Sequence, residues 1–168
     1  MSAAALILPI SLISALLLLV AALHDLAVRT VPNVIPALLL AAGLVLRAQD
    51  ATLLAGLAAM LCVFVATTIC WLRGWMGGGD VKLYAACSLL LAPAQVLPFV
   101  LASALFGGVL ALVYLSLRAV TPKRANGMRP RSLAARMLRC ERRRIRRGGP
   151  LPYAAAIALG AIFTLAAA

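Results

Sequence analysis

The sequence has very little negative charge. Only four of its 168 residues are acidic, and they are Asp25, Asp50, Asp80 and Glu141. It has a single histidine, His24, and none of its four cysteines forms a CxxC pair. This inventory argues against a zinc site, and we expect neither a metal nor a cofactor. Three of the cysteines fall in apolar runs, where we expect them to pack as small apolar side chains.

Aromatic residues are also scarce, at 5% of the chain, and this bears on the net charge of +12. Twelve of the sixteen basic residues lie within the segment 118–150. Because these arginines are not interleaved with aromatic side chains, we expect no nucleic-acid partner. We interpret the segment as a basic loop at the surface of a bilayer with anionic lipids. The alternative is an interfacial helix whose apolar face would consist of Leu133, Met137, Leu138 and Ile145.

Apolar residues, by contrast, make up 65% of the chain, whereas soluble domains are closer to half apolar. Apolar runs of about 18 residues or more recur without strand-like alternation, and only helices or closed barrels satisfy the backbone in lipid. We therefore predict an all-α, polytopic membrane helix bundle of about six transmembrane helices, forming a single domain. The expected spans cover about 4–23, 34–46, 52–72, 80–92, 95–117 and 151–168. We expect the first to be a retained helix rather than a cleaved signal, and the short fourth to be tilted or buried.

The distribution of basic residues predicts the orientation in the membrane. If both termini are outside, in the periplasm, then Arg29, Arg73, Lys82 and the loop 118–150 face the cytoplasm, and only Arg47 does not. The same topology places Asp25 and Asp80 together on the cytoplasmic side of the membrane. A pair of carboxylates thereby becomes geometrically possible.

The stretch Gly77-Gly78-Gly79-Asp80-Val81-Lys82 stands between two apolar runs. A carboxylate near the hydrocarbon region is costly and points to a function. Two facing carboxylates share a proton, so that one can activate water while the other polarises a scissile carbonyl. We expect the three glycines to allow positive φ and the close approach of an extended peptide. The simpler alternatives are a helix N-cap for Asp80 and a flexible loop for the glycines.

The first apolar run is followed by His24 and Asp25, and Asp25 sits where the helix is expected to end. A carboxylate is unfavourable near the negative end of a helix dipole, so capping explains Asp25 poorly; an ordinary interfacial aspartate is the alternative. Pro32 breaks the helix before it, and Asn33 is the expected N-cap of the next helix. Lys82 either tunes the charge of the carboxylate pair or marks the cytoplasmic boundary.

In these residues the chain resembles the type IV prepilin peptidases, membrane aspartyl proteases of the GxGD class. Gly77-Gly78-Gly79-Asp80 matches GxGD, and Asp25 with the nearby Val31-Pro32-Asn33 is similar to the family's first aspartate segment. Pro152-Tyr153 resembles the proline-tyrosine segment that opens the last helix, although Ala155 stands where a second proline is expected. The resemblance covers residues 5–165.

This resemblance implies cleavage of a prepilin or pseudopilin leader after a glycine, at the cytoplasmic face of the bacterial inner membrane. It implies that Asp25 and Asp80 are catalytic. The residues implied to support the site or bind substrate are Gly77, Gly78, Gly79, Lys82, Pro32, Asn33 and Tyr153. The compact form is similar to the peptidases of Flp-type (tight-adherence) pili. We expect no zinc or methyltransferase domain, because Asp25 comes too early to leave room for one.

Two other functional classes remain open from the sequence. A small transporter or proton-relay protein would also carry intramembrane carboxylates, but it predicts acids spread through the membrane depth or an inverted repeat. A non-catalytic subunit of a pilus or secretion assembly would tolerate Asp→Asn at both positions.

Overall fold

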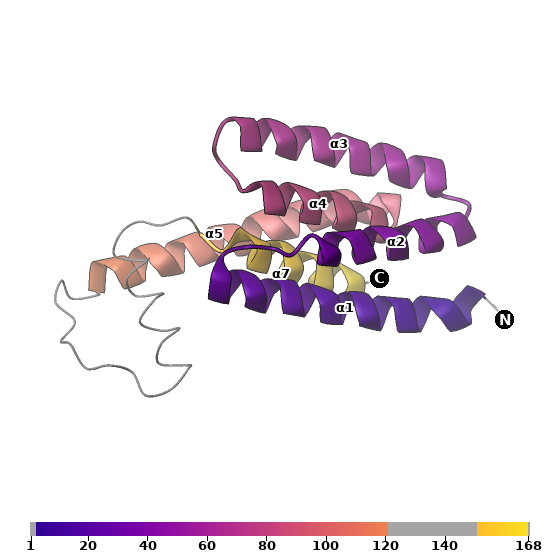
Figure 1. Cartoon of the computed structure of the whole chain (residues 1–168), viewed down its shortest axis with the longest axis horizontal. Coiled ribbons are helices and arrows are strands. Elements are labelled where there is room, and N and C mark those ends of the chain that lie inside the picture. Colours follow the sequence, from indigo (N-terminus) through magenta and orange to yellow (C-terminus); the bar gives the residue numbers. More distant parts are fainter. Residues whose placement is uncertain (1–2, 121–150, 168) are drawn as a thin grey trace. The chain divides into compact units, whose positions relative to one another are not determined.

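The structure is a computed structural model, and it describes residues 3–120 and 151–167. These residues form six α-helices and one short 3-10 helix, so the prediction of an all-α fold is confirmed. The helices are α1 (Ala3–Val28), α2 (Val34–Gln49), α3 (Leu53–Leu72), α4 (Gly78–Leu90), α5 (Val96–Val120) and α7 (Tyr153–Ala166), with η1 (Pro93–Gln95) before α5. Figure 1 shows their order along the chain.

Three of the helical segments are long and apolar enough to cross a membrane, namely Leu8–Val28, Leu53–Leu72 and Pro93–Ala119. Helices α2 and α7 are apolar but shorter. Helix α4 has only 13 residues and is buried along nearly its whole length, so the expectation of a short fourth helix buried among its neighbours is confirmed. The described part of the chain therefore supports a membrane protein with three candidate spans, and six full crossings stay a prediction.

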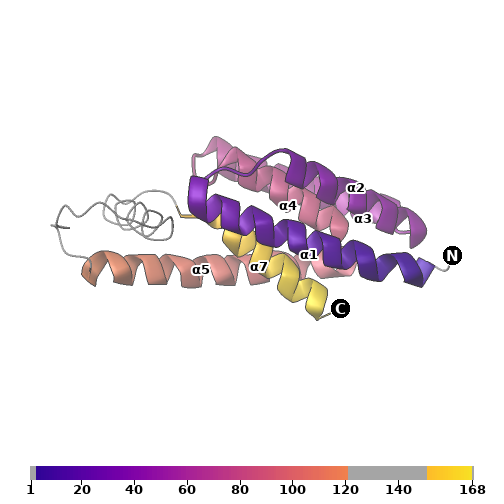
Figure 2. The ribbon, with the colours of Figure 1, turned by 60° about the horizontal axis from the view of Figure 1, so that its bottom comes forward.

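The chain forms two compact units, Met1–Gly107 with Pro152–Ala168, and Gly108–Leu151. The second contains the later part of α5 and all of the basic segment 118–150. Residues 121–150, where the interfacial helix is expected, lie outside the described residues. The first unit contains both aspartates of the candidate pair. In it α4 packs against α2 and α3, while α7 packs along α1 (Figure 2).

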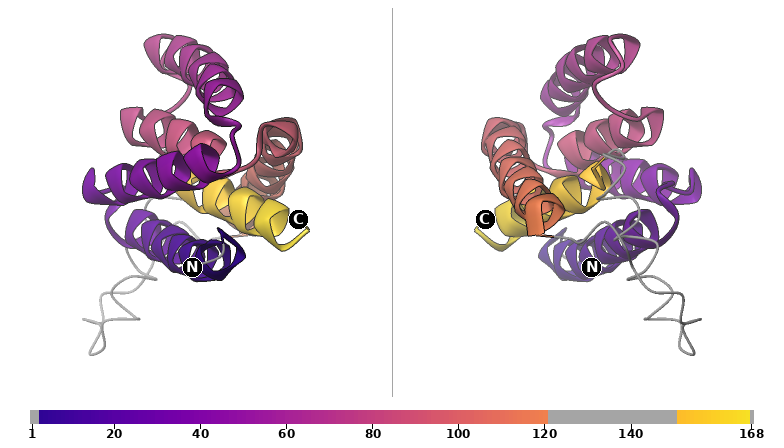
Figure 3. Two further views of the ribbon diagram at one scale, coloured as in Figure 1. Left: turned by 90° about the vertical axis from the view of Figure 1, so that its right-hand side faces the viewer. Right: turned by 90° about the vertical axis from the view of Figure 1, so that its left-hand side faces the viewer.

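End-on views of the first unit place α3 and α1 on opposite sides, with α2, α4 and α7 between them (Figure 3). In α3 only Gly56 is buried, and the rest of this apolar helix is exposed or half-buried, as expected of a helix that faces lipid on one side. The core consists of large side chains from the other helices, including Leu18, Leu39, Leu83, Leu90, Phe99 and Ile157. Helix α4, which carries Asp80, is thus held in place by its packing in this core.

Small residues bring the helices into close contact. A Cβ added at Gly43 of α2 would lie 2.8 Å from the backbone of Leu89 in α4, and one at Gly160 of α7 would lie 2.8 Å from the backbone nitrogen of Ser103 in α5. Apolar side chains gain little from leaving lipid, so close packing of small residues is a main source of helix association in membranes. These contacts hold the helices that position the site.

Candidate active site

Asp80 lies in the first turn of α4, three residues after the N-cap Gly77. Its Oδ2 accepts a hydrogen bond from the backbone N–H of Gly77 at 3.2 Å. Burial, and secondarily the charge of Asp25, raise the pKa of Asp80 from 3.8 to about 6, against the opposing effect of the Gly77 N–H. Asp80 is therefore not the N-cap residue itself, and its carboxylate interacts electrostatically with Asp25, which lies 55 positions earlier in the chain.

Asp25 lies in the last turn of α1, which continues to Val28, beyond the predicted end of the helix. Its side chain is buried, and Oδ2 accepts a hydrogen bond from the backbone N–H of Ala154 at 3.2 Å. Ala154 belongs to the first turn of α7, which begins after Pro152. Two helices distant in sequence thus meet at this carboxylate. The ends of α1, α4 and α7 that carry these groups lie toward the same end of the unit, on the left in Figure 1.

The segment between α1 and α2 reverses the chain beside Asp25. Arg29 has a φ of 63° and donates its backbone N–H to the carbonyl of Asp25, which ends α1. The Nδ1 of His24 donates to the carbonyl of Thr30 at 2.6 Å, so His24 stabilises the turn. Pro32 follows, and the break predicted there is confirmed.

Asn33 occupies the N-cap position of α2 as predicted, but the prediction that its side chain caps the helix is wrong. It makes no capping hydrogen bond and has helical dihedral angles. Its Oδ1 instead accepts a hydrogen bond from Nζ of Lys82 in α4 at 2.9 Å. A tertiary partner with a positive charge replaces the local backbone donor. Both Asn33 and Lys82 are candidate site residues by sequence, but the sequence did not predict that they contact each other.

The conformational role expected of the glycines is also wrong for this structure. Positive φ occurs at Gly74, whereas Gly77 is extended, with φ −78° and ψ 149°, and Gly78 and Gly79 begin α4. A Cβ added at Gly78 or Gly79 would meet its nearest neighbour at 3.5 Å, an ordinary contact. Neither the backbone angles nor the packing of the glycines at 78 and 79 requires glycine in this conformation.

Tyr153 opens α7 beside Ala154, and its ring covers Gly107 of α5. Its centroid lies 6.3 Å from that of Tyr84, which is buried in α4 four residues after Asp80. Sequence reasoning missed both Tyr84 and Ala154. The four-residue spacing could have placed Tyr84 on the face of Asp80. No side-chain signal could have identified Ala154, because its backbone makes the contact.

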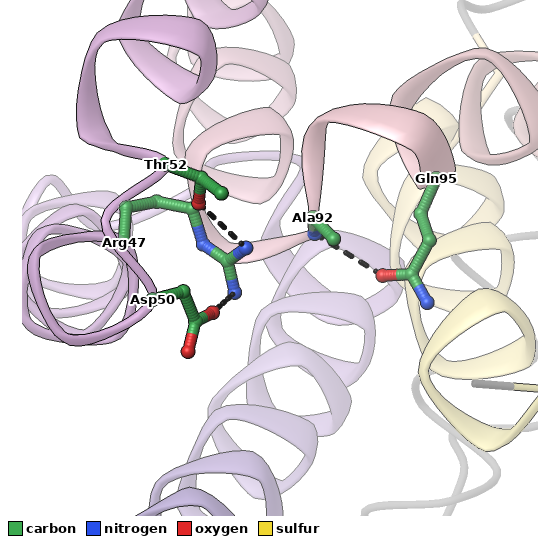
Figure 4. A network of polar contacts seen from close by, with 5 residues as sticks. All are labelled: Arg47, Asp50, Thr52, Ala92 and Gln95. Carbon is green, nitrogen blue, oxygen red and sulfur yellow. Dashed lines mark hydrogen bonds and ion pairs between the residues drawn. The ribbon is translucent and has the colours of Figure 1, made fainter. Parts of the chain in front are cut away.

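A separate polar cluster lies at the opposite end of α2 (Figure 4). Arg47 is buried, contacts Asp50 at 3.1 Å and donates to Oγ1 of Thr52 at 3.4 Å. Nearby, Gln95 accepts the backbone N–H of Ala92 at 3.1 Å. Asp50 is thus held in an ion pair with Arg47, at the end of α2 opposite Asn33. Residues 3–120 and 151–167 contain no cluster of three potential metal-ligating side chains.

The sequence was compared with those of known protein families. Residues 12–112, more than half of the chain, match the type IV leader peptidase family. The chain belongs to this family. Its members are aspartic prepilin peptidases, so the protein is an enzyme, and membership implies that it cleaves the leader from prepilins. The resemblance seen in the sequence is confirmed.

The matched region of this leader peptidase includes Asp25, the glycine run and Asp80, but ends before α7. Comparisons with curated proteins and with solved structures find no match. The hydrogen bond from Ala154 to Asp25 thus involves a residue outside the matched region.

Proposed function

We propose that this leader peptidase is an intramembrane aspartyl endopeptidase whose catalytic pair is Asp25 and Asp80. The observation that carries the proposal is that the end of α1 with Asp25 and the start of α4 with Asp80 lie at the same end of the first unit (Figure 1), where the charge of Asp25 helps raise the pKa of Asp80 to about 6. Two carboxylates whose charges interact, one of them with a raised pKa, suit general acid and general base roles. Asp50, the remaining described acid, is held in its own ion pair with Arg47.

Asp80, which its environment holds in the protonated form below about pH 6, acts as the acid, and Asp25 acts as the base. Asp25 takes a proton from water as the water oxygen attacks the scissile carbonyl, and Asp80 donates to the carbonyl oxygen. The C–N bond then breaks as the leaving amine takes up a proton from Asp25, and the Asp80 proton returns from the oxygen. No covalent enzyme intermediate is needed.

The glycines and their neighbours fit a role in substrate access. Gly78 and Gly79 adopt ordinary helical geometry with room for a Cβ, so their advantage is a backbone that an extended peptide can approach closely. Tyr153 supports the site because its ring packs against Gly107 of α5 and so holds the first turn of α7 in place. The N–H of Ala154 in that turn donates to Asp25. Pro32 contributes the break that starts α2, and its carbonyl accepts the N–H of Ile35.

The substrate is the leader of a Flp-type (tight-adherence) prepilin or pseudopilin, cut after a glycine at the cytoplasmic face of the bacterial inner membrane. The resemblance of the sequence to the compact peptidases of tight-adherence pili supports this choice of substrate. The concentration of basic residues in 118–150 supports termini in the periplasm and a loop on anionic lipids.

The test is cleavage of a co-expressed tight-adherence prepilin by the wild type, Asp25→Asn and Asp80→Asn. Both variants should reach the membrane at wild-type levels and leave the leader intact. Asp50→Asn is the matched control, because it removes a carboxylate at the opposite end of α2 and should still cleave. Wild-type cleavage by either Asp25→Asn or Asp80→Asn would disprove the catalytic pair.

A further inference from the structure

Two contacts join the segment after α1 to the first turns of α4. Lys82 Nζ donates to Asn33 Oδ1 at 2.9 Å, across 49 positions of sequence. Val31 lies against Gly79, where an added Cβ would be 3.5 Å from Cβ of Val31. The segment 29–33 is therefore attached to α4 at a polar and an apolar point.

These contacts join the segment that follows Asp25 to the helix that carries Asp80. The segment starts four residues after Asp25, and the Arg29 N–H is bonded to the Asp25 carbonyl. Lys82 is two residues after Asp80 in the same helix, so its side chain points away from that of Asp80. Lys82 is exposed, whereas Asp80 is half-buried.

Lys82 is also not among the groups that perturb Asp80. The charged group that acts on Asp80 is Asp25, together with the backbone N–H of Gly77. Arg29 is the titratable residue within the segment 29–33, and His24 precedes the segment in α1. The specific interaction that the structure assigns to Lys82 is its bond to Asn33.

We infer that Lys82 is a positioning residue, which holds the segment that follows Asp25 against the helix that carries Asp80 by donating to Asn33. The inference rests on the proposed function, since it assigns these two aspartates as the reacting pair. The bond is exposed at both ends, so it adds little to overall stability. Its importance lies in alignment, because small misplacements of catalytic groups slow a reaction strongly.

The experiment compares Lys82→Met, Asn33→Leu and the double variant in the full-length purified protein. The substrate is a purified tight-adherence prepilin, and the readout is kcat/KM as a function of pH. Each single variant should lose about tenfold in kcat/KM, mainly in kcat, as expected for one charge-assisted hydrogen bond. The double variant should lose no more kcat/KM than the less active of the two single variants, because both changes remove the same interaction.

The direction of the pH shift separates positioning from a direct charge effect. If the segment moves away, the charge of Asp25 acts less on Asp80, and the alkaline limb of the profile moves to lower pH in both single variants. If Lys82 acted through its own charge, Lys82→Met would move the limb to higher pH, and the neutral change Asn33→Leu would not move it. Additive losses, an upward shift in Lys82→Met, or unchanged activity in both singles would overturn the inference.

Two controls address folding. Gln49→Leu removes an exposed amide at the other end of α2 and should behave as the wild type. Lys82→Arg keeps a charged donor and should restore most of the activity lost in Lys82→Met; failure to restore it would also count against the bond to Asn33. The outcome is distinct from the proposed function, which fails only if Asp25→Asn or Asp80→Asn cleaves normally.

Discussion

The protonation of Asp80 gives the proposed mechanism a measurable pH dependence. Its pKa lies at about 6 instead of 3.8, so Asp80 holds its proton up to about pH 6 and loses it above. If Asp80 is the acid, kcat/KM falls about tenfold per pH unit above about pH 6, and is about 100-fold lower at about pH 8. The apparent value belongs to the pair rather than to one residue.

Removing the charge of Asp25 tests the origin of this value. Burial is the larger cause of the raised pKa and the Asp25 charge the second, so in Asp25→Asn the titration of Asp80 should fall below about 6 but stay above 3.8. Because this variant is expected to be inactive, the titration is followed by the infrared carbonyl band of the protonated carboxyl. Asp80→Asn identifies the band, which should disappear in that variant.

Two results would refute this reasoning. The first is a wild-type midpoint near 3.8, which would mean that Asp80 is neither desolvated nor near Asp25. The second is an unchanged or higher midpoint in Asp25→Asn, which would mean that the two carboxylates do not interact. A kcat/KM that is flat between about pH 5 and about pH 8 would separately exclude Asp80 as the acid.

Two further predictions concern the glycines. Gly43→Ala should lower the stability of the protein by about 1–3 kcal/mol, measured by thermal unfolding in detergent, because the new Cβ would lie 2.8 Å from the backbone of α4; an unchanged midpoint would show that the helices separate freely. Gly79→Ala should keep its wild-type stability or gain up to about 1 kcal/mol, because the Cβ meets Val31 at an ordinary 3.5 Å. The same variant should cleave prepilin up to about 100-fold more slowly if the peptide passes over this backbone, and wild-type cleavage would remove that role.

The helices and the candidate residues were predictable because the signals for them are local. Long apolar runs and the break at Pro32 set α1 and α3 to within a few residues, apart from the extra turn of α1 that contains Asp25. The scarcity of acids directed attention to Asp25 and Asp80. The motif around Asp80 was specific enough to indicate the family, which the match over residues 12–112 confirms.

The roles of individual neighbours were not predictable, because they depend on contacts across long sequence separations. Asn33 is a residue type that commonly caps helices, yet its side-chain oxygen accepts a hydrogen bond from Lys82 in another helix. The sequence showed three glycines and suggested positive φ, whereas in the structure Gly77 is extended and Gly78 and Gly79 are helical, at the start of α4.

By itself, the sequence determined that this protein is an α-helical membrane protein with one pair of candidate aspartates, because hydrophobic length and the identity of rare polar residues are local properties of a chain. The peptidase activity followed from the resemblance of its motifs to a known family. Only the tertiary structure decided that the α7 backbone binds Asp25, that Asp25 helps raise the pKa of Asp80, and that Lys82 reaches Asn33. A backbone N–H is present at every residue except proline, so which one meets a carboxylate is decided by helix packing and not by residue type.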